Sequence, residues 1–145
     1  MDIRISVDSN SKYIQESQNI RRKVFVEEQD IPAELDLDGL DGNSYHALAE
    51  LDNNVVGTAR LFIRGNKGIL ARVAVLKEYR GLGIAGKLIR SMLSFSQNLQ
   101  VGYIEIHAHK HLKSYYESFG FSYVRDVEVI GQHQLIEMSA QVSVT

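Results

Sequence analysis

The sequence has no cysteine among its 145 residues, which excludes a disulfide framework, a thiol nucleophile and a thiolate metal site. It also lacks an excess of positive charge, since 16 Lys and Arg stand against 18 Asp and Glu, so its charge does not favour nucleic acid. No apolar run approaches the ~20 residues that span a bilayer, and the N-terminus lacks a signal-peptide core. We therefore expect a cytoplasmic protein without a nucleic-acid or membrane partner.

The composition is that of a globular protein, with 44% hydrophobic and 23% charged residues, and the length fits one domain over residues 1–145. Hydrophobic periodicity separates strand-like from helix-like segments. The strand-like segments are 2–7, 46–51, 55–63, 69–76, 101–107, 121–124 and 134–142. The helix-like segments are 10–27, 84–95 and 109–118. This order predicts an α+β fold with a mixed, twisted sheet flanked by helices and one right-handed strand–helix–strand crossover.

Small residues gather where the predicted strand 69–76 gives way to the predicted helix 84–95. The free amides and the dipole of a helix N-terminus bind phosphate, and glycine lets a pyrophosphate approach the backbone. The stretch therefore indicates a phosphate-bearing ligand, and an ordinary strand-to-helix turn is the alternative.

Two known phosphate signatures fit this loop only in part. The spacing Gly81-x-Gly83-x-x-Gly86 matches the dinucleotide fingerprint, but four residues separate the glycines from the strand, and the preceding strands fit antiparallel hairpins. The spacing of Gly81, Gly86 and Lys87 approaches a P-loop, but Leu88 replaces the hydroxyl residue that holds magnesium.

A third pattern, Arg80-x-x-Gly83-x-Ala85, resembles the coenzyme A pyrophosphate loop of the GNAT (GCN5-related N-acetyltransferase) superfamily. The segment 73–75 looks like the central strand of that family, and 115–121 looks like its closing helix and Gly-Phe turn. Segments 21–29 and 38–46 are similar to the ElaA-like branch. The resemblance covers residues 20–138, most of the chain.

The resemblance implies transfer of an acetyl group from acetyl-coenzyme A to a primary amine of a small molecule or a protein, by direct attack and without a metal. A homodimer is compatible with it. The residues that the resemblance places at the coenzyme are Val73, Ala74, Val75, Arg80, Gly81, Leu82, Gly83, Ile84, Ala85, Gly86 and His109. Many relatives carry Asn or Gln where this chain has His109.

The resemblance places Tyr116 as the general acid that protonates the leaving thiolate, since a phenol keeps its proton at neutral pH. The alternative is a tyrosine that only packs on the sheet. The base that deprotonates the amine is less defined. His107 is the catalytic candidate, and the candidates on the acceptor side are Glu28, Asp38, Asp41 and His46. The acids of segment 27–41 are not interrupted by Lys or Arg, so we expect them to attract a cationic acceptor.

Two other functions remain open at this point. One is a non-catalytic acyl-coenzyme A sensor or interaction module. The other is an acyltransferase with another donor or acceptor that resembles the acyl-homoserine-lactone synthases. A metal site is not predicted, because a helix that begins near His109 would scatter His107, His109 and His111.

Overall fold

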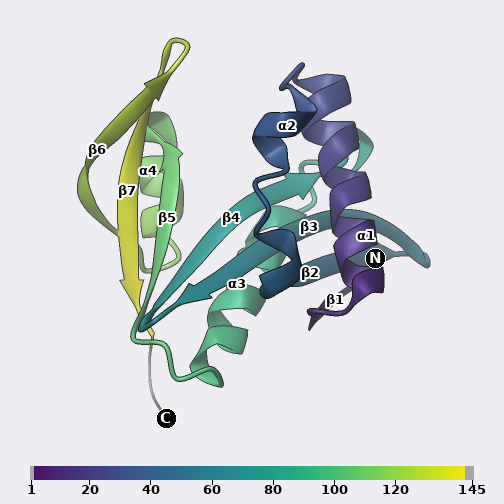
Figure 1. Ribbon diagram of the computed structural model, residues 1–145, viewed down its shortest axis with the longest axis horizontal. Coiled ribbons are helices and arrows are strands. Elements are labelled where there is room, and N and C mark those ends of the chain that lie inside the picture. Colours follow the sequence, from purple (N-terminus) through teal and green to yellow (C-terminus); the bar gives the residue numbers. More distant parts are fainter. Residues whose placement is uncertain (1, 143–145) are drawn as a thin grey trace.

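The computed structural model, which describes residues 2–142, contains a seven-stranded sheet in the order β1-β2-β3-β4-β5-β7-β6 (Figure 1). The strands are β1 (Ile3–Asp8), β2 (Ser44–Leu51), β3 (Asn54–Arg64), β4 (Lys67–Val75), β5 (Tyr103–His109), β6 (Ser122–Ile130) and β7 (His133–Gln141). Neighbouring strands are antiparallel except β4 and β5, which are parallel. The predicted α+β class, the mixed sheet and the β2–β4 meander are thus confirmed.

Four helices cover the two faces of this sheet. They are α1 (Ser11–Arg21), α2 (Ala33–Asp36), α3 (Ile84–Gln97) and α4 (Lys113–Glu117). Helices α1 and α2 lie on one face of β2–β4, and α3 lies on the other (Figure 1). Asn10 caps the N-terminus of helix α1, because its side-chain oxygen accepts a hydrogen bond from the Tyr13 amide at 3.0 Å. The helix continues beyond Arg21 as a π-helical segment, Arg22–Glu28. Within residues 2–142, no helix is long and apolar enough to cross a membrane.

The core differs between the two faces. On the α3 face, the apolar stripe of the helix packs on the sheet, and Ile84, Leu88, Ile89 and Met92 are almost fully buried. On the α1 face, buried charges take much of the space. Arg21 Nη1 lies 2.8 Å from Asp41 Oδ1, and Arg60 Nη2 lies 2.8 Å from Asp38 Oδ2. These ion pairs join α1 and β3 to the segment 36–41.

Arg72 of β4 completes this network from an unusual backbone position. Thr58 faces Ala74 whereas Arg60 faces Ala71, so β4 carries an extra residue and forms a bulge. Arg72 has a φ of 56°, and its Nε lies 3.0 Å from Asp36 Oδ1, an ion contact without hydrogen-bond geometry. The bulge therefore ties the strand to the segment 36–41.

The network predicts loss of stability at low pH. Burial raises the pKa of Asp41, but hydrogen bonds from Arg21, Gln18 and Arg60 outweigh this and lower the pKa from 3.8 to about 2. The stabilisation that follows, about 2 kcal/mol, is present above pH 4 and is lost as pH falls toward 2. Urea unfolding at pH 7, 4 and 2.5 measures this loss. The Asp41→Asn variant should show a smaller decline between pH 4 and 2.5, and an equal decline would contradict the assignment.

The functional region is positioned by the separation of β4 from β5. The two strands pair only where Lys67–Ile69 meets Tyr103–Glu105, and beyond Ile69 and Glu105 they diverge. The predicted strand boundary was wrong here. Polar and apolar side chains continue to alternate through His109, which pairs with Leu135 of β7, so β5 begins and ends two residues later than predicted and α4 begins only at Lys113.

Candidate active site

Two cavities adjoin where β4 and β5 diverge. The first, about 450 Å³, lies between β4, the start of α3 and the π-helical segment. The second, about 590 Å³, lies between β4, β5, α4 and the segment 29–36. Phe25, Gln29 and Val73 line both cavities, so the two cavities meet at the bulge of β4. We refer to the two adjoining cavities together as the passage.

The glycine loop forms one end of the first cavity. Gly81 and Gly83 line it with φ values of 83° and 77°, and a Cβ on either residue would meet no atom within 4 Å. Gly83 caps α3 without a side-chain hydrogen bond, so the first amides of the helix, including those of Ala85 and Gly86, have no side-chain partner at the cap. An open space in front of such amides fits a pyrophosphate.

Nine of the predicted coenzyme residues line this first cavity. They are Val73, Ala74, Val75, Arg80, Gly81, Gly83, Ile84, Ala85 and Gly86. Leu82 is 38% exposed and is not among the lining residues, and His109 lines the second cavity instead. The structure thus brings most of the predicted set together along one side of one cavity.

A side chain at Gly83 is expected to block the ligand. The Gly83→Val variant places methyl groups in the open space before the amides and should weaken acetyl-coenzyme A binding at least ~10-fold, about 1.4 kcal/mol, in calorimetric titration. Gly65→Val is the matched control, since Gly65 also has a positive φ of 61° and open space around it but lies in the β3–β4 turn. Equal weakening by both variants would show that backbone strain, not the cavity, is responsible.

Arg80 lines the first cavity, and hydrogen bonds to two other residues fix its side chain. Its guanidinium forms a bidentate pair with Glu28, with both N–O distances 2.6 Å, and its Nε donates to the Val75 carbonyl at 3.0 Å. The hydrogen bond from Arg80 lowers the pKa of Glu28, and Glu28 raises that of Arg80. Glu28 was predicted on the acceptor side, and it lies instead beside the glycine loop.

The Glu28→Gln variant tests whether this ion pair competes with a phosphate. Removing the carboxylate frees the guanidinium, so affinity for acetyl-coenzyme A should rise about 3-fold, whereas Arg80→Gln should lower it. Titration of the two variants under identical salt conditions checks this. Weaker binding in Glu28→Gln would instead show that Glu28 holds Arg80 in its binding position.

Tyr116 and His107 both line the second cavity. Tyr116 on α4 is half-buried, and burial, with a smaller effect of Tyr115, raises the pKa of its phenol. A phenol with a raised pKa stays protonated at neutral pH and can donate to a base. His107 projects from β5 with its side chain 38% exposed, and its Nε2 lies 3.2 Å from Glu105 Oε2.

His109 offers an unused polar atom in the same cavity. Its Nδ1 is buried and has no hydrogen-bond partner among residues 2–142. Burial lowers the pKa of His109, and the nearby His133 and His111 lower it further. A neutral imidazole at this position can donate or accept one hydrogen bond to a ligand.

The other residues predicted on the acceptor side do not line the two cavities. They are Asp38, Asp41 and His46. Asp41 and His46 are buried in the ion network, where His46 Nε2 lies 3.0 Å from the Asp41 carbonyl, and neither lines the two cavities. Asp38 is paired with Arg60 and Arg72. The expectation of a free anionic surface was wrong, because arginines distant in sequence neutralise these carboxylates.

Sequence reasoning missed several residues that line the cavities, among them Tyr115, Phe25 and Gln29. Tyr115 lines the first cavity, whereas the adjacent Tyr116 lines the second. Phe25 and Gln29 line both cavities because the π-helical segment turns them toward β4. The similarity of segment 21–29 to the ElaA-like branch was the one sequence signal that this segment contributes to the site. Its π-helical turn has no evident local signature in the sequence.

Comparison with known proteins shows which family the chain belongs to. The family model described as "Acetyltransferase (GNAT) domain" matches residues 11–141. A Bacillus subtilis (strain 168) protein, named provisionally as an acetyltransferase, is 33% identical over 105 residues, which are 70% of this chain and 71% of that protein.

Solved structures show the same fold. Escherichia coli ElaA superimposes with a TM-score of 0.82 and 25% identity, over 96% of this chain and 99% of its own. A GNAT family acetyltransferase from Elizabethkingia anophelis, whose crystal structure has acetyl-coenzyme A bound, gives a TM-score of 0.73 at 15% identity, over 96% of this chain and 97% of its own. By the match of residues 11–141 above all, the chain belongs to the GNAT family of acetyltransferases.

Proposed function

We propose that this protein transfers an acetyl group from acetyl-coenzyme A to a primary amine. The observation that carries the proposal is the passage between β4 and β5, which has the glycine loop at one end and Tyr116 at the other. One end fits a pyrophosphate and the other holds a proton donor, which is the arrangement that acyl transfer from a thioester requires. The fold that this chain shares with a protein that has acetyl-coenzyme A bound supports the choice of donor.

Binding of the coenzyme is assigned to main-chain groups along this passage. The amides at the start of α3 hold the pyrophosphate, with the dipole of the 14-residue helix directed at it. Beyond Ile69, β4 is not paired with β5, so main-chain groups of Val73 and the amide of Val75, whose carbonyl accepts from Arg80 Nε, are available to the pantetheine arm. A backbone amide at the bulge polarises the thioester carbonyl as negative charge develops on its oxygen.

Acetyl-coenzyme A supplies an activated acyl group and a thiolate leaving group. Tyr116 donates its phenolic proton to the leaving sulfur, and water that enters the second cavity takes the proton of the amine. Direct attack is the route that suits this chain, because it has no cysteine to carry an acyl intermediate. The acceptor is a small-molecule or protein amine, and we place the reaction in the cytoplasm. A role of His107 as the base stays a prediction, since its Nε2 faces carboxylates.

Release of free thiol from acetyl-coenzyme A across a panel of primary amines tests the function. The protein has no thiol of its own, so every thiol detected comes from the coenzyme. We expect release that depends on one class of amine and is lost in Gly83→Val. Binding without release on any amine would favour the sensor function, and release without an amine would contradict transfer to nitrogen.

A further inference from the structure

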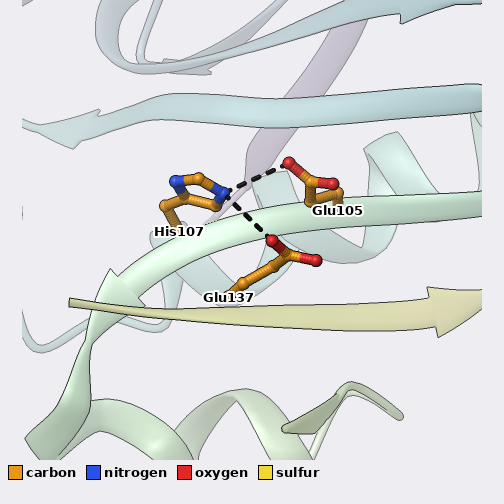
Figure 2. Close-up of side chains that lie close together, drawn as sticks. All are labelled: Glu105, His107 and Glu137. Carbon is orange, nitrogen blue, oxygen red and sulfur yellow. Dashed lines mark ion pairs between the residues drawn. The ribbon is translucent and has the colours of Figure 1, made fainter. Parts of the chain in front are cut away.

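A second cluster of functional side chains lies on the face of the sheet that β5 and β7 share. Glu105 and His107 lie two residues apart on β5 and so project from the same face of the sheet. Glu137 is the residue of β7 directly opposite His107. Figure 2 shows the imidazole directed at both carboxylates. His107 Nε2 lies 3.2 Å from Glu105 Oε2 and 3.8 Å from Glu137 Oε1.

The three side chains bring potential metal-ligating atoms together. One ligand atom of each residue lies within 4.8 Å of the other two. Tetrahedral coordination at the ~2.0–2.2 Å distances typical of zinc would bring such atoms to about 3.4 Å from one another. Small side-chain movements would close this gap, and the strand register already holds the three side chains on one face of the sheet.

Neighbouring cations hold the two carboxylates in place. Lys67 Nζ of β4 lies 3.2 Å from Glu105 Oε1, which leaves Oε2 directed at His107. Arg125 Nε of β6 lies 3.1 Å from Glu137 Oε1. Contacts of this kind orient metal ligands from outside, but here they also compete with a metal for the same charge. Both effects are testable by removing the cations.

We propose that Glu105, His107 and Glu137 form a binding site for a divalent transition-metal ion of the zinc class. One imidazole nitrogen with two carboxylate oxygens suits zinc and its first-row neighbours, whereas calcium and magnesium prefer oxygen ligands alone. Glu105 and Glu137 are 14% and 15% exposed and His107 is 38% exposed, so an ion can enter from the side of the histidine.

The position of the site connects it to the neighbouring cavity. His107 lines the second cavity, so a metal bound to its Nε2 lies beside that cavity, into which we expect the acceptor amine to enter. Three protein ligands leave a fourth position of a zinc ion open, and a nitrogen or oxygen atom of an acceptor can occupy it. Metal binding itself does not depend on acetyl transfer, so either proposal can fail while the other stands.

Calorimetric titration of chelator-treated protein with ZnCl₂ at pH 7 tests the site, and Co²⁺ absorption gives an independent readout of coordination. We expect binding of one ion per chain, weakened at least ~10-fold in His107→Gln and in Glu137→Gln. Arg125→Gln should strengthen binding, because it releases Glu137 from a competing cation. An account in which these groups form only ion pairs predicts no effect of Arg125 on metal affinity.

Two control variants separate this site from other metal-binding groups. Asp126→Asn removes an acid from the exposed strand β6 that pairs with Lys110 rather than with the cluster, and it should leave zinc affinity unchanged. His133→Asn removes a histidine that packs against His109. Loss of binding in His133→Asn but not in Glu137→Gln would overturn the assignment, as would the absence of stoichiometric binding in the wild-type protein. Thermal unfolding of each metal-free variant confirms that it is folded.

Discussion

Replacing Tyr116 by phenylalanine is expected to lower kcat for acetyl transfer by about 100-fold or more, with little change in acetyl-coenzyme A affinity. The variant removes one hydroxyl from a half-buried ring and leaves the ring contacts with Tyr115 and Phe121 in place. General acid catalysis contributes about 10²–10⁴-fold to reactions of this kind. Steady-state kinetics with the best amine of the panel, together with calorimetric titration of the coenzyme, measures both quantities.

The control for this variant is Tyr45→Phe. Tyr45 also loses one hydroxyl, but it lies on β2, packs against Phe95 and lines neither cavity. It should change kcat less than 2-fold on the expectation for substitutions away from the reacting groups. A kcat in Tyr116→Phe within a few-fold of the wild type would show that water or another residue protonates the thiolate, and Tyr116 would then be a packing residue.

Replacing Arg21 by methionine is expected to lower the free energy of unfolding by about 3–5 kcal/mol, the cost of breaking a buried ion pair by removing one partner. Arg21 is fully buried, and it contacts both Asp36 and Asp41. Although burial lowers its pKa, hydrogen bonds to Asp41 and Asp36 raise it overall. Its removal leaves Asp36 with a single cationic partner, Arg72, within the described residues 2–142. Urea unfolding followed by circular dichroism gives the difference.

The neighbouring residue supplies a matched control for this substitution. Arg22 is also on the helical segment, but it is exposed and pairs with Glu27 at the surface. Arg22→Met should change the free energy of unfolding by less than ~1 kcal/mol, because exposed ion pairs contribute little. Similar losses in both variants would indicate that helix propensity, rather than the buried network, accounts for the effect of Arg21→Met.

The glycine loop could be predicted from the sequence because its chemistry is local. Free amides, small residues and a helix start occupy one continuous segment, and Gly81 and Gly83 line the first cavity. Their role in binding a pyrophosphate stays a prediction. Tyr116 could be placed for a similar reason, since it lies a fixed distance before the Gly-Phe turn that ends its helix. The hydrophobic periodicity also located the seven strands along the chain, although it placed both ends of β5 two residues too early.

The acidic segment 27–41 could not be interpreted from its own composition. Its charge suggested an attractive surface for a cationic acceptor. Its carboxylates at positions 36, 38 and 41 instead pair with arginines of α1, β3 and β4, namely Arg21, Arg60 and Arg72. Pairings between segments so distant in sequence depend on the tertiary fold, and a single sequence does not reveal them. The same limit concealed the cluster of Glu105, His107 and Glu137, because it requires the pairing of β5 with β7.

Calorimetric titration of the wild-type protein with acetyl-coenzyme A tests the central claim, that the passage between β4 and β5 binds this coenzyme through the glycine loop. The account predicts saturable binding at one site per chain, with loss of affinity in Gly83→Val and retention in Gly65→Val. Absence of binding, or binding of a nicotinamide dinucleotide in its place, would contradict the claim and return the loop to the dinucleotide interpretation.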